Sequence, residues 1–334
     1  MGGRDGFGDA AVGLHGLVGL VGVAVEIKPV ITQDELLGLL TGVFVEPVTA
    51  VHSINSGQIA KAFFFETAGQ EYVIRLTRPN VAVGLHKDAF AYRHFASPRL
   101  PIPPVVRVGD YAGYTYAITR RMPGKILDEY SGEAYEALVP SIIETLDAIH
   151  QTDVSGTTGY GSFDGQGMGL FASWPDFLLT VGDEEDDGGF YGKWHGLFET
   201  TFLDRGLFDE IYAEMKALLP FCPAERYLVH ADYAFSNVLA ADGQVTAVLD
   251  WANAYYGDFL FDVAWLIVGM ERVDFDGRFR RYYQSQGRTI PHYDERLRCC
   301  ACYICLDAFR FYAKTGQETA YQWMKKRISH ILDD

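Results

Sequence analysis

The chain has 334 residues, of which 49% are hydrophobic and 22% are charged. This composition describes a globular protein with room for about two domains or lobes, and it excludes a disordered or fibrous chain. Lys and Arg total 28 against 44 Asp and Glu, which gives a formal net charge of −16. A field of this sign repels nucleic acid and anionic membrane surfaces, so a small cationic partner is favoured.

Residues 1–26 are rich in Gly, Ala, Val and Leu but lack the features of a targeting segment. Arg4 is offset by Asp5 and Asp9, so the positive start of a signal peptide is missing. The apolar run is broken by His15 and several glycines, and it is short for a membrane helix. We therefore predict a flexible extension outside the catalytic body.

Five cysteines include a cluster at positions 299, 300, 302 and 305, in an apolar segment of helical periodicity. Two interleaved Cys-x-x-Cys spacings suggest zinc, but no second pair and no His-x-x-x-His motif lies nearby. The pattern favours core thiols on a buried helix face. An odd number of cysteines also argues against a disulfide framework and for a reducing compartment, which predicts a cytoplasmic protein.

The first third of the chain has the pattern of a small antiparallel sheet with one inserted helix. Thr32 and Glu35 match a capping box before Leu36, which predicts a short helix that ends near Gly42. Runs of β-branched and aromatic residues between turn residues then indicate strands. The expected order is strands over 43–54, 61–67 and 71–77, a helix over 87–96, and strands over 105–108 and 114–121.

Beyond residue 123 the pattern changes to helices. Ile142, Ile143, Leu146 and Ile149 recur at helical spacing and predict a helix over 133–151. Further helices are expected within 174–181, 194–219, 262–270 and most of 293–332. A Gly-rich loop over 159–169 and an acidic loop over 183–189 lie between them.

These elements predict an α+β protein of two lobes. A nucleotide-binding lobe over 27–122 carries a small antiparallel sheet, and a larger, mostly helical lobe over 123–334 carries the catalytic and substrate-binding residues. The hinge is expected near 118–124, with the active site in the cleft between the lobes.

Three polar residues carry the main indication of chemistry. Asp232, Asn237 and Asp250 occur in the order that kinase-type phosphoryl-transfer enzymes use, Asp-x-x-x-x-Asn followed by a metal-binding Asp. A single short motif of this kind occurs often by chance, whereas the joint pattern is far less frequent. His230, between an apolar strand and the loop, is more typical of a packed support than of an acid or base.

The same residues are brought together by a predicted hairpin. Apolar runs over 237–240 and 244–250 flank Asp242 and Gly243, a strong turn signal. Folding the hairpin places Asn237 nearly opposite Asp250 and gathers two oxygen ligands. This arrangement suits Mg²⁺, which keeps several waters and takes its other ligands from phosphates.

The nucleotide phosphates need an anchor from the sheet lobe. Arg75 lies in an alternating strand, and Asp88 on the next helix is the partner expected to hold its guanidinium. Protein kinases use Lys and Glu here, and Arg with Asp keeps the charges but changes the reach. The alternative is that Arg75 and Asp88 form an exposed ion pair on the surface, without a role in nucleotide binding. The turn at Ser56 and Gly57 offers backbone N–H groups to the phosphates, although it lacks the Gly-x-Gly-x-x-Gly pattern.

About residues 43–273 resemble the aminoglycoside phosphotransferase family of the kinase-like fold, and within it the hygromycin B-type branch. The segments that carry the resemblance are 92–97 (YRHFAS), 100–103 (LPIP), 159–161 (GYG), 174–177 (WPDF), 228–232 (LVHAD) and 248–251 (VLDW). Many members have Gly where this chain has Ala231, a change that the hygromycin-type enzymes share. The acidic loop over 183–189 is particular to this chain and lies where the family builds its antibiotic pocket.

The resemblance implies a role for each matching residue. Asp232 matches the catalytic base, Asn237 and Asp250 match the metal ligands, and Arg75 matches the nucleotide-binding cation. Adenine recognition is implied for the hinge backbone near Arg121 and Met122. The implied cofactors are ATP, or GTP in its place, and Mg²⁺.

The implied reaction is phosphorylation of a hydroxyl group on a cationic antibiotic, hygromycin B first. Carboxylates at Asp153 and Glu271 are expected to hold the cationic substrate, with solvated surface acids as the alternative for each. Two other functions stay open: a kinase for another small hydroxyl compound such as a macrolide, choline or a sugar, and a non-catalytic nucleotide or drug-binding protein. The oligomeric state, monomer or dimer, is left undecided.

Overall fold

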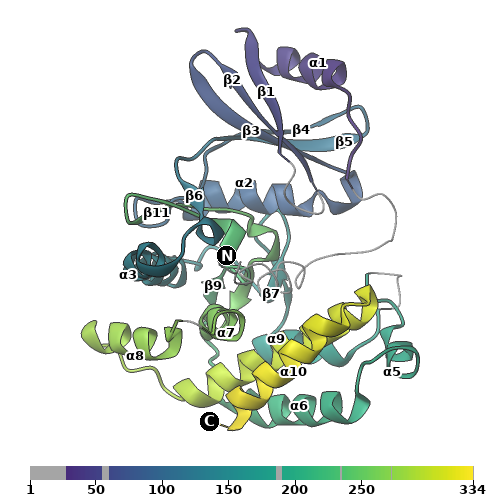
Figure 1. Ribbon diagram of the computed structural model, residues 1–334, viewed down its shortest axis with the longest axis vertical. Helices are drawn as coiled ribbons and strands as arrows, with labels where there is room; N and C mark the ends of the chain where they lie inside the picture. Colours follow the sequence, from purple (N-terminus) through teal and green to yellow (C-terminus); the bar gives the residue numbers. More distant parts are fainter. Residues whose placement is uncertain (1–27, 55–59, 186–189, 234, 272, 334) are drawn as a thin grey trace, which may run out of the picture.

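The computed structural model describes residues 28–54, 60–185, 190–233, 235–271 and 273–333, and it divides into a small and a large lobe (Figure 1). The predicted two-lobed α+β architecture is thereby confirmed. The predicted N-terminal extension, the turn at Ser56 and Gly57, and part of the acidic loop lie outside the described residues.

The small lobe is built on a five-stranded antiparallel sheet in the order β1-β2-β3-β5-β4. Its strands are β1 (Val48–Ile54), β2 (Lys61–Thr67), β3 (Gln70–Thr77), β4 (Val105–Tyr111) and β5 (Tyr114–Arg120). Helix α1 (Gln33–Val43) opens with the predicted capping box, in which the Glu35 N–H donates to Thr32 Oγ1 and the Thr32 N–H donates to the Glu35 carboxylate. Leu36 and Leu40 of this helix pack with Phe65 of the sheet to form the core of the lobe.

Helix α2 (Val83–Phe95) lies below the sheet, between the two lobes (Figure 1). It follows the 3₁₀ turn η2 (Pro79–Val81) and begins four residues before the predicted start at 87. The early start escaped prediction because Val83 and Gly84 have low helix propensity. Phe90 and Phe95 of α2 pack in the core of the large lobe, with residues of α3 and α7 (Leu260–Gly269), and not in the core of the sheet.

The large lobe is mostly helical (Figure 1). Its helices are α3 (Gly132–His150), α4 (Trp174–Leu179), α5 (Leu197–Thr200), α6 (Arg205–Leu218), α7, α8 (Phe275–Ser285), α9 (Tyr293–Thr315) and α10 (Glu318–Asp333). Helix α9 packs against α6, α7 and α10, and the four clustered cysteines are buried on it, as predicted for core thiols.

Two predicted helical segments contain breaks that the periodicity did not reveal. The segment 194–219 divides because Asp204 accepts the Leu207 N–H at 3.1 Å and caps a new helix, α6. The segment 293–332 divides at Gly316, whose φ of 72° ends α9 in the left-handed conformation that favours glycine. Helix α8 was not predicted at all.

Short strands position the loops of the large lobe. One sheet has the order β11-β10-β6 and another has the order β8-β7-β12-β9. Their bounds are β6 (Lys125–Ile126), β7 (Tyr160–Phe163), β8 (Gly169–Phe171), β9 (Tyr227–Val229), β10 (Val238–Ala241), β11 (Gln244–Val248) and β12 (Tyr255–Gly257). The predicted Gly-rich loop, 159–169, thus contains β7 and ends where β8 begins. Gly159 is required where they meet, since a Cβ there would lie 2.2 Å from the Gly169 carbonyl oxygen.

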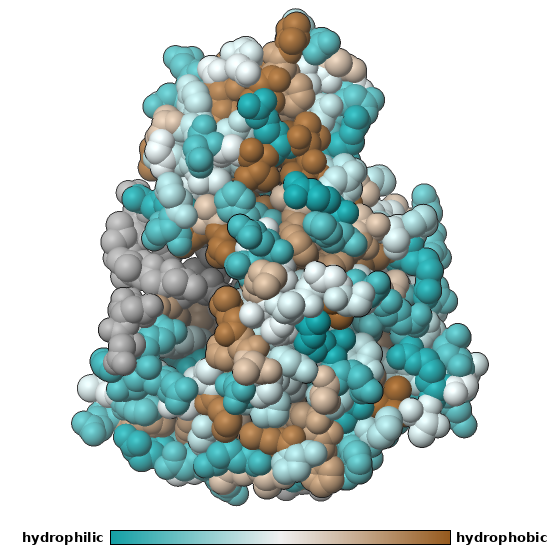
Figure 2. Space-filling view, turned by 180° about the vertical axis from the view of Figure 1, so that it is seen from behind, coloured by the Kyte–Doolittle hydropathy of each residue, from teal (hydrophilic) through white to brown (hydrophobic). Residues whose placement is uncertain are grey.

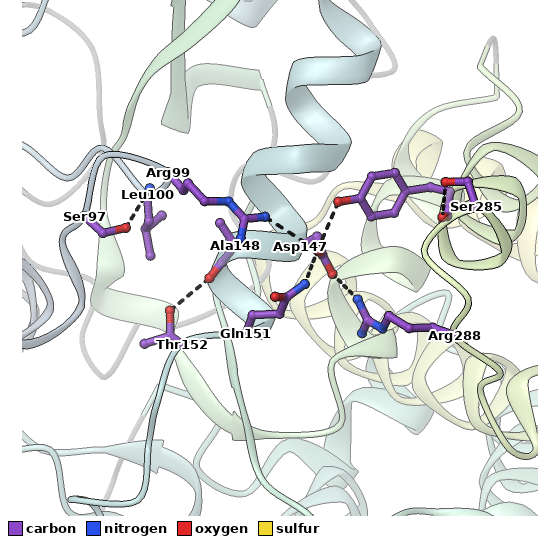
Figure 3. Close-up of polar contacts among 10 residues, drawn as sticks. Ser97, Arg99, Leu100, Asp147, Ala148, Gln151, Thr152, Ser285 and Arg288 are labelled. Atoms are coloured by element: carbon purple, nitrogen blue, oxygen red, sulfur yellow. Dashed lines mark hydrogen bonds and ion pairs between the residues drawn. The ribbon is translucent and has the colours of Figure 1, made fainter.

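A buried carboxylate joins three segments of the large lobe (Figure 3). Asp147 of α3 accepts hydrogen bonds from Gln151, from the Tyr282 hydroxyl at 3.0 Å and from the Arg288 guanidinium, and Arg99 lies 3.9 Å away. Its side chain is 1% exposed, so the charge depends on these donors for its solvation.

We expect Asp147→Asn to lower the free energy of unfolding by about 2 kcal/mol, because the amide accepts fewer hydrogen bonds and no longer balances Arg288. Urea unfolding of the purified proteins measures this loss. The matched control is Asp276→Asn on α8, whose carboxylate pairs with Arg280 at the surface and whose removal is expected to cost less than about 1 kcal/mol. Equal midpoints for the two variants would contradict the role of Asp147.

Hydrophilic side chains cover most of the face in Figure 2, and hydrophobic ones gather in several separate patches. Among the described residues, no helix combines the length and the apolar character that crossing a membrane requires.

Candidate active site

The predicted hairpin forms and sets the position of two site residues. Strands β10 and β11 pair antiparallel, with Val238 opposite Val248 and a turn at Asp242 and Gly243. Just beyond the paired strands, the Leu249 N–H donates to the Asn237 carbonyl at 2.7 Å. Asn237 is therefore one residue out of register with Asp250, close to the predicted arrangement, and both residues lie at the same end of the ribbon.

Asp232 lies against Asn237. The Asn237 Nδ2 group donates to Asp232 Oδ2 at 2.8 Å and to the Asp232 carbonyl at 3.1 Å. Burial raises the pKa of Asp232 well above its ordinary value, and the charge of Asp250 raises it further, against the hydrogen bonds of Asn237 and Asn253. The three residues of the predicted motif therefore lie close enough to affect one another electrostatically.

The loop that carries Asp232 is fixed by a residue that the sequence analysis missed. Asp262, in the first turn of α7, accepts the His230 N–H at 2.9 Å and the Ala231 N–H at 2.7 Å. These bonds hold Ala231 in the left-handed region at a φ of 62°. His150 Nε2 lies 3.0 Å from the same carboxylate. The available signal was a lone Asp inside the apolar run of α7, because buried carboxylates are rare unless they are paired.

His230 supports the loop, as predicted, and does not face the site as a free acid or base. Its Nε2 donates to the Leu249 carbonyl at 2.9 Å, and its Nδ1 accepts the Asp232 N–H at 3.3 Å. This pattern fixes the neutral tautomer with the proton on Nε2. Burial lowers the pKa of His230, in agreement with a neutral ring. The imidazole thus links the Asp232 loop to the strand that leads to Asp250.

The predicted pair of Arg75 and Asp88 is present. The Arg75 guanidinium on β3 forms an ion pair with Asp88 Oδ2 on α2. The second oxygen of Asp88 accepts the Trp251 N–H at 2.8 Å. Asp88 therefore connects the expected phosphate anchor to the backbone immediately after Asp250, a link that spacing in the sequence did not indicate.

Arg121 and Met122 directly follow β5, at the predicted hinge. Their hydrogen bonds favour one of the two for the predicted contact with adenine. Arg121 donates its N–H to the Glu71 carbonyl at 3.1 Å, and its guanidinium pairs with the Glu71 carboxylate at 2.8 Å. Its amide is therefore engaged within the sheet lobe. Met122 comes next, and in the described part of the chain its backbone has no hydrogen-bond partner. Met122 is thus the stronger candidate for an adenine contact.

Within the described residues, no hydrogen bond or ion pair links Asp153 or Glu271, the two residues predicted to bind the substrate, to Asp232. Asp153 is exposed, and its carboxylate accepts the Ser155 N–H at 2.8 Å, which caps a turn and lowers its pKa. Glu271 is exposed beyond the end of α7. From Asp262, which holds the Asp232 loop, to its last residue Gly269, α7 rises by roughly 10 Å, and Glu271 follows after Met270, which is extended. A substrate contact of Asp153 or Glu271 stays a prediction, and the exposure of both residues agrees with the alternative of solvated surface acids.

A tyrosine links Asp232 electrostatically to a buried ion pair on α9. Tyr255 on β12 lies within electrostatic range of Asp232 and of Asp307 on α9. Asp307 pairs with Arg310, which lies at 2.6 Å, and accepts the Tyr191 hydroxyl at 2.9 Å. These residues border the described part of the acidic loop and escaped prediction because long-range packing alone brings α9 to the site.

The residues at the end of the ribbon fit a hard cation. The carboxylate of Asp250 is exposed, and the amide of Asn237 donates through Nδ2, which leaves its oxygen Oδ1 to face a ligand. The charge of Asp250 contributes to the raised pKa of Asp232, so the two carboxyl groups lie close enough to repel each other, and a cation bound beside them would relieve this repulsion. The described residues include no group of three or more His, Cys, Asp or Glu side chains placed to hold a metal. Two protein oxygens suit Mg²⁺, which takes further ligands from water and phosphates.

Comparison with known proteins identifies the family. The profile of the phosphotransferase enzyme family (APH) matches residues 50–297. The chain belongs to this family. It is 34% identical to hygromycin-B 4-O-kinase of Escherichia coli over 309 residues, which are 91% of this chain and 86% of that protein.

Solved structures agree with this membership in the APH family. A thermostable mutant of aminoglycoside phosphotransferase APH(4)-Ia, in ternary complex with AMP-PNP and hygromycin B, matches with a TM-score of 0.75 at 31% identity. The match covers 90% of this chain and 98% of that one. Macrolide 2'-phosphotransferase MphH from Brachybacterium faecium matches with a TM-score of 0.59 at 17% identity, over 87% of this chain and 98% of that one. This lower likeness shows the fold alone.

Proposed function

We propose that this member of the APH family is an ATP-dependent kinase that phosphorylates hygromycin B, and that the acceptor is the 4-hydroxyl group. The observation that carries the proposal is the convergence of Asp232, Asn237 and Asp250, with Arg75 and Asp88 joined to the same loop. The 34% identity to hygromycin-B 4-O-kinase supports the choice of antibiotic and of hydroxyl. The net charge of −16 favours a substrate that carries amino groups.

In the proposed reaction a bond forms between the acceptor hydroxyl oxygen and the γ-phosphorus of ATP. The bond from that phosphorus to the β,γ-bridging oxygen breaks, and ADP leaves with the bond's electron pair. Asp232 orients the hydroxyl and accepts its proton. Asn237 donates to Oδ2 of Asp232 at 2.8 Å, and Asn253 also hydrogen-bonds to this carboxylate, so the two amides hold it in place for the acceptor.

Asn237 and Asp250 are the residues that would hold Mg²⁺. Held there, Mg²⁺ would neutralise charge on the phosphate oxygens. Arg75 is expected to contact the phosphates from the sheet lobe, and Met122 to contact adenine with its backbone. We also expect the protein to act in the cytoplasm, where its unpaired thiols stay reduced.

Mass spectrometry after incubation with Mg-ATP and a panel of aminoglycosides tests the proposal. We expect hygromycin B to gain one phosphoryl group and ³¹P–¹H correlation spectra to place the group on the 4-oxygen. Parallel reactions with GTP decide which nucleotide is used. No gain on hygromycin B would refute the substrate, and a gain on a macrolide instead would favour the second kinase hypothesis. No transfer to any acceptor would favour a binding protein.

Asp250→Asn tests the metal assignment. We expect the Mg²⁺ concentration for half-maximal rate to rise by about 10 to 100-fold, because a neutral amide is a weaker ligand than a carboxylate, while the KM for hygromycin B stays nearly unchanged. The matched control is Asp242→Asn in the turn of the same hairpin, which is exposed and at a φ of 51° that Asn tolerates. Saturation of Asp250→Asn at the parent Mg²⁺ concentration would show that the assignment is wrong.

A further inference from the structure

The short turn after Asp250 is held at both ends by two adjacent residues of α2. The turn is η8 (Trp251–Asn253), and the Ala254 N–H closes it by donating to the Trp251 carbonyl at 3.0 Å. Asp88 accepts the N–H at its start, from Trp251, at 2.8 Å. Lys87 Nζ donates to the carbonyl at its end, on Ala254, also at 2.8 Å. We call these two neighbouring residues of α2, Lys87 and Asp88, with their hydrogen bonds to the two ends of the turn, the bracket.

The packing of α2 makes this bracket rigid. Phe90 and Phe95 of α2 belong to the core of the large lobe, so the helix is fixed on the same body as the turn. Gly84 lets the two elements approach closely, since a Cβ at that position would lie 2.9 Å from Ala252 Cβ. The bracket therefore spans from a helix of the sheet-lobe segment to the loop that carries the metal ligand.

Lysine side chains are rarely buried as deeply as that of Lys87. It is 1% exposed, and its ammonium lies 4.3 Å from the centre of the Phe163 ring. No salt bridge to a carboxylate is found for it within the described residues. Burial lowers its pKa to about 7, although the charges of Asp88 and Asp250 oppose this shift. Burying an amine in this way is unfavourable, and an apolar side chain of similar length would fill the space at lower cost.

We propose that Lys87 is a positioning residue for phosphoryl transfer, which together with Asp88 holds the turn 251–253 and so fixes Asp250 and Asn253 relative to Asp232. This inference rests on the proposed function. Lys87 is the more informative of the two bracket residues, because Asp88 also holds Arg75 and its loss would disturb the nucleotide anchor as well. The structure describes no contact between Lys87 and Arg75, so the loss of Lys87 leaves the nucleotide anchor in place.

The test compares Lys87→Met with the parent protein by thermal unfolding and by kinetics. Without ligands we expect the melting temperature to stay near that of the parent, because Met fills a similar volume without a buried amine. With saturating ADP we expect the Mg²⁺ concentration for half of the thermal stabilisation to rise by about 10 to 100-fold, the usual effect of losing a residue that orients a ligand. The kcat is expected to fall by a similar factor, with the KM for hygromycin B unchanged.

Lys216→Met is the matched control, since Lys216 on α6 lies over the Tyr212 ring at 4.7 Å and does not contact the site. It is expected to keep the parent's Mg²⁺ dependence. Should Lys87→Met fail to fold, Gly84→Ala tests the same bracket, because the added methyl group meets Ala252. The same rise in the Mg²⁺ requirement is expected for it.

An unchanged Mg²⁺ dependence in the variant that folds overturns the inference, as does a parent that Mg²⁺ fails to stabilise in the presence of ADP. The thermal measurement needs no acceptor substrate. If the parent phosphorylates no aminoglycoside, the proposed function fails, while the thermal shift still decides whether Lys87 positions the turn.

Discussion

Asp232→Asn is expected to lower kcat by about 10² to 10⁴, the range for loss of a positioned general base. The amide keeps the volume of the side chain and still accepts the hydrogen bond from Asn237, but it cannot take the proton of the acceptor hydroxyl. The KM for ATP should change little, because the nucleotide contacts are assigned to Arg75 and to the hinge. Steady-state rates at saturating Mg-ATP and hygromycin B provide the measurement.

The same substitution is expected to leave the ligand-free protein as stable as the parent or more stable at pH 7. Burial and the charge of Asp250 raise the pKa of Asp232 in the folded state. Stability is therefore lost as the pH rises above the unfolded-state pKa of about 4, because the unfolded chain releases this proton more readily than the folded protein does, and the loss is absent below that pH. Melting temperatures measured without Mg²⁺ at neutral and acid pH should differ from the parent only at neutral pH.

Asp153→Asn serves as the matched control for Asp232→Asn. Its carboxylate caps an exposed turn, and Asn can accept the same hydrogen bond from the Ser155 N–H. We expect kcat and both KM values to match the parent. A raised KM for hygromycin B in this control would restore Asp153 as a substrate contact, and an unchanged kcat in Asp232→Asn would remove Asp232 from the mechanism.

Sequence patterns predicted correctly those features that residues close together in the chain determine. The capping box at Thr32 and the turn at Asp242 and Gly243 each involve residues a few positions apart, and both form as predicted. Asp204 and Gly316 are residue types that often cap helices, so they could have indicated the two helix breaks. The prediction instead followed the apolar periodicity, which continues across both positions. Short strands such as β9 and β12 could not be predicted, because three residues carry too little periodicity to distinguish a strand from a loop.

The candidate site was predictable to the extent that it is contiguous in sequence. Asp232, Asn237 and Asp250 lie within one hairpin and its preceding loop, so their spacing was informative. Lys87 and Asp262 act on this segment from other helices, and only the folded packing brings them to it. For the same reason the assignment of Asp153 and Glu271 to the substrate stays a prediction, because it rests on their nearness to helix ends and the sequence does not show where those ends point.

Asp262→Ala is expected to lower the free energy of unfolding by about 3 to 5 kcal/mol, the cost of removing one member of a buried charged network. The side chain is 0% exposed and accepts two backbone N–H groups, from His230 and Ala231, and lies 3.0 Å from His150 Nε2. Alanine leaves these donors without a partner in the interior. Urea unfolding measures the loss, and Asp209→Ala on the exposed face of α6 is the control, with little expected change.

Asp262→Asn separates the effect on stability from the effect on catalysis. The amide keeps the volume and one acceptor oxygen, so the expected loss of stability falls to about 1 to 3 kcal/mol. One backbone N–H then meets the amide NH₂ group, and Ala231 is no longer held firmly at its φ of 62°. Because Asp232 is the next residue, kcat should still fall, by about 10-fold or more for a displacement well below 1 Å. A variant that loses stability but keeps the parent kcat would mean that Asp262 supports the fold of the lobe without positioning the base.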